Sequence, residues 1–262
     1  MSNRRSSRTL LVAVTLVALV AFTGESWAPA ADQEAAEGIS VLFVGNSLTV
    51  QNDLPAMLEA LLRSGGWNEV RVASLSQPGF GLEDHWRGGV ARAAIREGEW
   101  DVIVLQQGPS ATEGRPSLLE YSSRFAEKAR DAGARVGLYM VWPSKARSFD
   151  FEGVSESYSM AADSADGLLF PVGDAWREAW CRDPDLALYG PDAFHPSPVA
   201  TYLAALVIYG RLTGSDPRGL TSRLDLDSGY APDLSLEDET ATLLQEAAAA
   251  TNAAEASEAC RG

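Results

Sequence analysis

The hydrophobic positions of the chain form short continuous runs that alternate with longer amphipathic stretches. The continuous runs are typical of strands covered on both faces. They predict strands at Ser40–Val44, Val70–Leu75, Val102–Leu105, Arg135–Val141 and Leu168–Val172. The stretches between them predict helices at Leu54–Arg63, Leu82–Arg96, Ser117–Ala132 and Val154–Asp166. This alternation indicates βαβ units, with right-handed crossovers that place helices on both faces of a parallel sheet. The predicted fold class is α/β, a three-layer α/β/α sandwich with a central parallel sheet.

Several helices carry recognisable end signals. Asn52 or Asp53 can cap the first of them. Ser197 can cap a later apolar run, Val199–Leu212, which has a proline in its first turn. The Ala- and Glu-rich stretch Leu236–Ala256 predicts one more helix, and no segment marks a second domain.

The first thirty residues have the layout of a secretory signal peptide. A basic opening precedes the apolar run Leu10–Phe22 and the small-residue segment Ala28-Pro29-Ala30, which resembles a cleavage site. The apolar run is shorter than the roughly 20 residues of a membrane-spanning helix, although an uncleaved N-terminal anchor remains the alternative. We therefore expect a signal peptide at 1–30, a linker at 31–38 and one domain with a C-terminal helical tail at 39–262. The predicted location is secreted or periplasmic, with no membrane span after signal cleavage.

Charge and cysteine content narrow the possible partners. The 262-residue chain has a formal net charge of -15, which argues against nucleic acid or an anionic membrane surface as a partner. Its only two cysteines, Cys181 and Cys260, can form a disulfide in an oxidising compartment or remain unpaired. No His or Cys partners cluster near them, so neither a metal site nor a cofactor is expected.

Candidate catalytic groups lie at opposite ends of the predicted domain. Ser47 follows the first buried strand in Gly45-Asn46-Ser47-Leu48-Thr49, and Asp192 and His195 precede the apolar helix near the C-terminus. Ligands of open parallel sheets bind at the carboxyl ends of the strands, and the Asp192–His195 loop can return to that edge. A serine, an imidazole and a carboxylate are the groups of a nucleophile, its base and the group that orients the base. The chain has only two histidines, so the choice of base is narrow.

These residues resemble the conserved blocks of a known family. Gly45-Asn46-Ser47-Leu48-Thr49 is similar to the first block of the SGNH (GDSL-type) hydrolases, with Asn in place of the usual Asp, and Asp192-Ala193-Phe194-His195-Pro196 is similar to their last block. The resemblance covers essentially the whole chain after the predicted signal peptide. It implies a flavodoxin-like sandwich, no metal, and ester hydrolysis through an acyl-enzyme. It also implies Ser47 as nucleophile, His195 as base and Asp192 as its orienting group.

The same resemblance suggests an oxyanion hole. The family's second block supplies a glycine N–H, for which Gly79 is the first choice and Gly81 the alternative; a turn that only needs glycine is the competing interpretation of Gly79. The third block normally supplies an Asn side chain. This chain departs from that pattern after its third strand, where Gln106, or Gln107 beside it, is the candidate amide donor.

Other residues near the same edge have two interpretations. His85 is either a helix histidine partnered by Glu83 or Asp84, which we favour, or part of a substrate pocket in which Trp86 stacks on a sugar or covers an acyl chain. Trp142 ends the fourth predicted strand and lines either the pocket or the edge of the core.

The sequence thus predicts a serine esterase. We expect short acyl esters, acetyl above all, on a small-molecule or carbohydrate substrate. A lipase- or phospholipase-like enzyme is the first alternative. A non-catalytic carbohydrate-binding protein, which has kept the fold and lost turnover, is the second. The acyl group, the alcohol and the oligomeric state are not predicted by the sequence.

Overall fold

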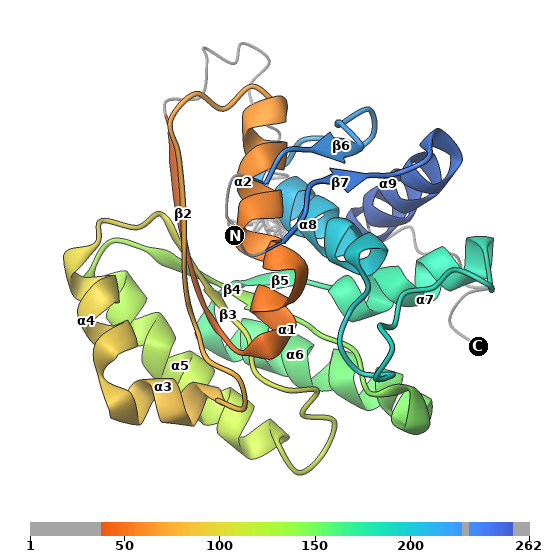
Figure 1. Cartoon of the computed structure of the whole chain (residues 1–262). Coiled ribbons are helices and arrows are strands. Elements are labelled where there is room, and N and C mark those ends of the chain that lie inside the picture. The colour runs from red at the N-terminus through yellow and green to blue at the C-terminus, as the bar shows by residue number, and fades with distance from the viewer. Residues whose placement is uncertain (1–37, 227–230, 254–262) are drawn as a thin grey trace, which may run out of the picture. The chain divides into compact units, whose positions relative to one another are not determined.

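The computed structural model describes residues 38–226 and 231–253, and a five-stranded parallel sheet is its central element (Figure 1). The strand order is β2-β1-β3-β4-β5, and every neighbouring pair is parallel. The strands are β1 (Ile39–Gly45), β2 (Val70–Ser76), β3 (Val102–Leu105), β4 (Arg135–Tyr139) and β5 (Leu168–Phe170). This order is that of flavodoxin-like folds, in which ligands bind outside the carboxyl ends of the strands.

Helices cover both faces of the sheet. One face carries α2 (Leu54–Ser64) and α8 (Pro198–Thr213), and α7 (Val172–Arg182) and α9 (Asp238–Asn252) pack on α8 (Figure 1). The other layer is formed by α3 (Leu82–Gly88), α4 (Val90–Glu97), α5 (Arg115–Asp131) and α6 (Phe151–Ala165). The three-layer α/β/α fold predicted from the sequence is confirmed.

The core is centred on β1, β3 and α8. The four strand residues Val41–Val44 are at most 2% exposed, because helices lie on both sides of them. In α8, every residue from Ala200 to Gly210 is buried. This follows from its place between the sheet and the outer helix α9 (Asp238–Asn252), and explains why its hydrophobic residues are not confined to one side.

Most predicted boundaries agree with the structure within two residues, with three informative exceptions. The helix predicted at Leu82–Arg96 is two helices, because Gly89 adopts a φ of +80° between them. The fifth strand ends at Phe170, and a helix that the hydrophobic pattern did not reveal, α7 (Val172–Arg182), begins two residues later. A short antiparallel pair, β6 (Arg223–Leu224) and β7 (Leu234–Ser235), was also not predicted.

Some predictions concern residues outside the described ranges. The signal peptide and nearly all of the linker lie there, as do Cys260 and the end of the last predicted helix. Cys181 lies in α7 and is disulfide-bonded. Within 38–226 and 231–253, no helix is long and apolar enough to cross a membrane.

Candidate active site

Ser47 lies at the carboxyl edge of the sheet, where β1 passes directly into a short helix, α1 (Ser47–Val50). Asn46 caps this helix, since its side-chain oxygen accepts a hydrogen bond from Leu48 N at 3.1 Å. As the first residue of α1, Ser47 has a backbone N–H with no carbonyl one turn earlier to bind. The serine is therefore held between a buried strand and a helix start, with a free N–H beside its hydroxyl.

The turn that carries Ser47 is fixed by buried side chains. Gln106 is fully buried, and its Oε1 accepts hydrogen bonds from Asn46 N and from Thr49 Oγ1, both at 2.8 Å. Gly45 permits this close approach. A Cβ at Gly45 would come within 2.4 Å of Thr49 Oγ1 and 2.6 Å of Gln106 Oε1. The absence of a side chain at this position is what allows the amide to reach the turn.

His85 supports the same turn from the other side. Its Nε2 donates a hydrogen bond to Gly45 O at 2.7 Å, and its ring is only 8% exposed. The partner predicted for it was wrong, because Glu83 binds Tyr121 and Asp84 caps α3 through Gly81 N. His85 is thus bound to the nucleophile turn, and contact of Trp86 with a substrate stays a prediction.

The loop that carries Asp192 and His195 is a tight hairpin-like turn. Gly190 N donates to His195 O at 2.7 Å, and Tyr189 forms a bridge with Pro196. Ala193 adopts a left-handed φ of +58°, which residues other than glycine rarely adopt. Asp192 Oδ1 accepts hydrogen bonds from the N–H groups of Phe194 and His195, at 3.1 and 2.9 Å. One carboxylate oxygen thus organises the loop and leaves the other for the imidazole.

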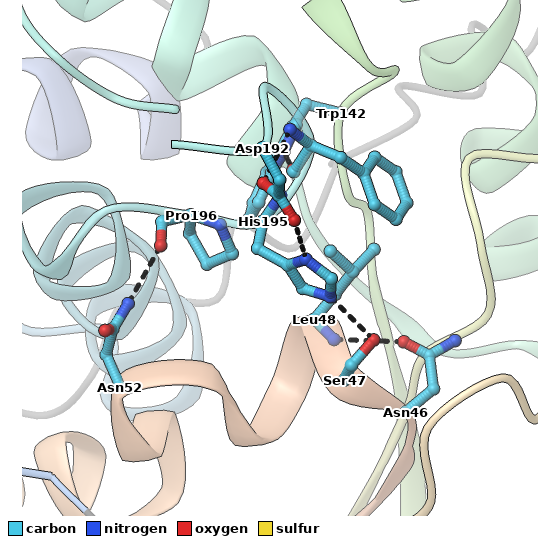
Figure 2. Close-up of polar contacts among 9 residues, drawn as sticks. Asn46, Ser47, Leu48, Asn52, Trp142, Asp192, His195 and Pro196 are labelled. Carbon is cyan, nitrogen blue, oxygen red and sulfur yellow. Dashed lines mark hydrogen bonds and ion pairs between the residues drawn. The ribbon is translucent and has the colours of Figure 1, made fainter. Parts of the chain in front are cut away.

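The turn that carries Ser47 and the loop that carries Asp192 meet at the imidazole of His195 (Figure 2). His195 Nδ1 lies 2.5 Å from Asp192 Oδ2, and His195 Nε2 lies 2.9 Å from Ser47 Oγ. The carboxylate can only accept, so Nδ1 carries the proton and Nε2 is free to accept the serine proton. These hydrogen bonds, that from the ring first, lower the pKa of Asp192 to about 2, so the orienting group is ionised at neutral pH. Ser47, His195 and Asp192 thus have the geometry of nucleophile, base and orienting group.

Further contacts hold the loop from behind. Trp142 is fully buried and stacks on Trp176, and its Nε1 donates to Phe194 O at 2.9 Å (Figure 2). The backbone N–H of Lys145 donates to Ala193 O at 2.9 Å. Trp142 is therefore a support of the base loop and not a pocket wall. Trp86 lies against Phe125 in the opposite helical layer.

The predicted side-chain donor of the oxyanion hole is wrong. Gln106 Nε2 donates to Gln107 O at 2.6 Å, and its amide has no access to solvent or substrate. The alternative, Gln107, directs its Nε2 to Ser110 Oγ and Gly114 O. The Nε2 groups of both glutamines therefore donate to atoms of the loop after β3, and neither hydrogen-bonds to Ser47.

Gly79 remains a prediction as an oxyanion donor. It has a φ of +80° in a turn closed by Phe80 N and Gln77 O, so the turn requires glycine. Its loop is tied to the nucleophile, because Asn46 Nδ2 donates to Phe80 O at 2.9 Å. The alternative, Gly81, already uses its N–H to bind Asp84.

Comparison with solved structures gives the class of protein. A candidate SGNH hydrolase from Slackia heliotrinireducens is 28% identical, with a TM-score of 0.57 over 67% of this chain and 100% of its own. A DUF4886 family protein from Bacteroides uniformis ATCC 8492 is 16% identical, with a TM-score of 0.66 over 81% of this chain and 93% of its own. An acetyl xylan esterase, AlAXEase, is 15% identical, with a TM-score of 0.52 over 66% and 98% of the two chains. No protein-family model and no curated protein matches the sequence.

Serine hydrolases differ in where the fold places the nucleophile. One class has a flavodoxin-like sheet with the serine on an open edge, outside the strand ends, and another places the serine in a strand–turn–helix elbow. The likeness to SGNH and GDSL-type structures extends over about two thirds of this chain. The chain has the fold of the SGNH (GDSL-type) hydrolases, and the hydrogen-bonded Ser47, His195 and Asp192 make it a serine hydrolase of this kind.

Proposed function

We propose that this serine hydrolase cleaves carboxylic esters through an acyl-enzyme on Ser47. The observation that carries the proposal is the unbroken hydrogen-bonded series from Ser47 Oγ through the imidazole of His195 to Asp192. Ser47 Oγ attacks the ester carbonyl while its proton passes to His195 Nε2. The tetrahedral intermediate then collapses, and the leaving alcohol takes that proton. Water, activated by the same imidazole, hydrolyses the acyl-enzyme to the free acid and restores Ser47.

The remaining groups of the site stabilise the charges that develop during the reaction. Asp192 is ionised and stabilises the imidazolium that forms at each proton transfer. The free N–H of Ser47, together with that of Gly79, is proposed to bind the oxyanion. One such donor is worth about 3–4 kcal/mol in the transition state. With both glutamine amides occupied elsewhere, backbone donors carry this role.

We further propose that short acyl groups on carbohydrate are the preferred substrates. A cleft of about 1070 Å³ is lined by residues of α2 and β2 and by Val50, three residues after Ser47; Ser47, Asp192 and His195 are not themselves among its lining residues. Its wall includes the hydroxyls of Ser74 and Ser76, with the small side chains of Ala56 and Ala60 opposite. Among the described residues that line it, none is aromatic and few are long and apolar. This lining suits a polar alcohol better than a long acyl chain.

The first experiment measures turnover of p-nitrophenyl acetate, p-nitrophenyl octanoate and an acetylated xylo-oligosaccharide, with Ser47→Ala as the control. We expect hydrolysis of the acetyl esters, and a loss of at least about 10⁴-fold in kcat for Ser47→Ala. Preference for the octanoate would replace the carbohydrate proposal with a lipase-like one. A folded protein that binds the oligosaccharide and hydrolyses none of the three esters would replace the esterase with a binding protein.

Export is a separate proposal that rests on the signal-like sequence of residues 1–30. Expression of the full chain in a bacterial host, followed by N-terminal sequencing of the exported fraction, tests it. A mature N-terminus close to Ala30 is the expected result. An intact Met1 in the cell fraction would contradict it.

A further inference from the structure

A single amide side chain joins the nucleophile segment to the base loop. Asn52 lies in the short helical turn η1 (Gln51–Asp53) that follows α1. Its Nδ2 donates to Pro196 O at 2.9 Å (Figure 2) and to Thr201 Oγ1 at 2.9 Å. Pro196 is the residue after His195, so both N–H donors of the amide are used on the side of the molecule that carries the base.

The backbone at this point is unfavourable, which indicates a specific reason for the residue. Asn52 and Asp53 both adopt left-handed conformations, with φ of 56° and 55°. Two consecutive residues of this kind persist only where the surroundings hold them. Asn tolerates the conformation better than most residues, but glycine would do so more readily. A purely conformational requirement would favour glycine, so the side chain of Asn52 has a role of its own.

Helix capping does not explain Asn52. The cap of α2 is Asp53, whose Oδ1 accepts a hydrogen bond from Ala56 N. Thr201 Oγ1 in turn donates to Ser197 O, so it presents a lone pair to Asn52. Both bonds of the amide therefore run to the segment from Pro196 to α8.

We propose that Asn52 is a positioning residue that sets the separation between Ser47 Oγ and His195 Nε2. The contacts form a closed ring, from Ser47 along α1 to Asn52, across to Pro196, and back through His195 to Ser47. Trp142 and Lys145 hold the loop at Phe194 and Ala193. Within the described residues, Asn52 makes the only side-chain hydrogen bonds from the nucleophile's own segment to the segment from His195 to α8, other than the Ser47–His195 bond itself.

The expected effect is on the chemical step. A displacement of about 1 Å between reacting groups costs on the order of 100-fold in rate. Asn52→Ala is expected to lower kcat for p-nitrophenyl acetate by about 10- to 100-fold, while KM changes by less than about 3-fold. Asn52 also lines the cleft proposed for the sugar, but p-nitrophenyl acetate carries no sugar, so with this substrate binding is not the parameter that moves.

Three variants separate the hydrogen bonds from the backbone conformation. Asn52→Gly accommodates the left-handed φ but has no amide. Asn52→Ala lacks the amide and also disfavours the left-handed φ. Asn52→Asp keeps the shape of the side chain but cannot donate a hydrogen bond to either oxygen when ionised. Asp53→Asn is the matched control, because it keeps the cap of α2 and the left-handed backbone position without a hydrogen bond to the base loop. Asp53 also lines the cleft proposed for the sugar, so the control is assayed with p-nitrophenyl acetate. The four proteins are compared by kcat, KM, thermal midpoint and rate of labelling by a fluorophosphonate.

This inference rests on the proposed function, and the experiment distinguishes the two failures. We expect the Gly and Ala variants to lose kcat and labelling rate equally, although Gly has the higher thermal midpoint, with Asp at least as impaired and the Asp53→Asn control within about 2-fold of wild type. A Gly variant with wild-type kcat, or variants that raise KM alone, would overturn the positioning role. Wild-type protein that neither turns over nor labels would instead overturn the proposed function.

Discussion

The two halves of the active site are built in different ways. The nucleophile turn is part of the buried framework: Asn46 is 8% exposed, Gln106 is fully buried, and regular structure precedes and follows Ser47. The base loop is irregular and half-exposed, with side-chain exposures of 28% for His195 and 51% for Asp192. Its shape comes from local hydrogen bonds and from a few contacts to the rest of the fold. The serine is thus positioned by the core, whereas the histidine is positioned by individual polar contacts.

This difference predicts that damage to the nucleophile turn costs both stability and activity. Gln106→Leu leaves Asn46 N and the Thr49 hydroxyl without their buried acceptor, which should lower the free energy of unfolding by about 2–4 kcal/mol. Because Asn46 precedes the nucleophile, kcat should fall by about 100-fold as well. Urea denaturation and p-nitrophenyl acetate kinetics measure the two effects.

A buried glutamine far from the site provides the control for that variant. Gln245 in α9 binds Gly219 N, Leu220 O and Tyr202 Oη. Gln245→Leu should lower stability by a similar amount and leave kcat within about 2-fold. If both glutamine variants reduce kcat alike, the loss reflects general destabilisation and not the nucleophile turn.

Damage to the base loop should act more on activity than on stability. Trp142→Phe keeps an aromatic ring stacked on Trp176 but removes the N–H that binds Phe194 O. We expect a loss of about 1 kcal/mol in stability and of about 3- to 10-fold in kcat. Trp180→Phe is the matched control, since its Nε1 binds Leu186 O in the same aromatic cluster but outside the loop. Equal kcat in the two variants would contradict a supporting role for Trp142.

The left-handed residue of the base loop allows a stabilising change. Ala193→Gly removes a conformational cost of about 1–2 kcal/mol, offset by about 0.5–1 kcal/mol from the greater freedom of glycine in the unfolded chain. The net expectation is a gain of up to about 1 kcal/mol in chemical denaturation, with kcat nearly unchanged. Ala193→Val, which is β-branched, should be destabilised, and a stable Val variant would show that this φ is not a constraint.

The smallest expected effect is a pH dependence of stability. The pKa of Asp192 is lowered to about 2 in the folded protein from its ordinary value of 3.8. The unfolded chain therefore takes up the proton first, and the stabilisation from this carboxylate is present above about pH 4 and lost as the pH falls towards 2. Wild type should lose more stability than Asp192→Asn across this window. Parallel stability profiles for the two proteins would contradict the lowered pKa.

The same contrast explains what the sequence could and could not predict. Continuous apolar runs located all five strands of the sheet, because a strand buried on both faces is apolar at successive positions. The strand ends in turn located the edge of the sheet where Ser47 lies. The roles of residues in the second and third blocks were harder to predict. Gln106 has the same amide group whether that group binds the substrate or Asn46, so the residue type does not decide between the two. Its orientation is decided by the absence of a side chain at Gly45, which the sequence alone does not connect to it.

The contacts that Asn52 and Trp142 make with the base loop could not be predicted, for a related reason. Each side chain donates a hydrogen bond to a backbone carbonyl of the base loop. Every residue has such a carbonyl, so these bonds leave no recognisable pattern in the sequence. The Asn52-Asp53 pair did carry a signal, because two residues that tolerate left-handed conformations stand together before a helix. The pattern predicts a single cap at one of the two positions, whereas in the structure Asn52 binds Pro196 O and Asp53 caps α2.

The most direct test of the central claim is intact-mass and peptide mapping of the protein after reaction with a fluorophosphonate. The account predicts one adduct, on Ser47, in the wild-type protein, and strongly slowed labelling in His195→Ala. Ser47→Ala should acquire no adduct. A single adduct on another residue, or labelling of Ser47 that does not depend on His195, would contradict the assignment of nucleophile and base.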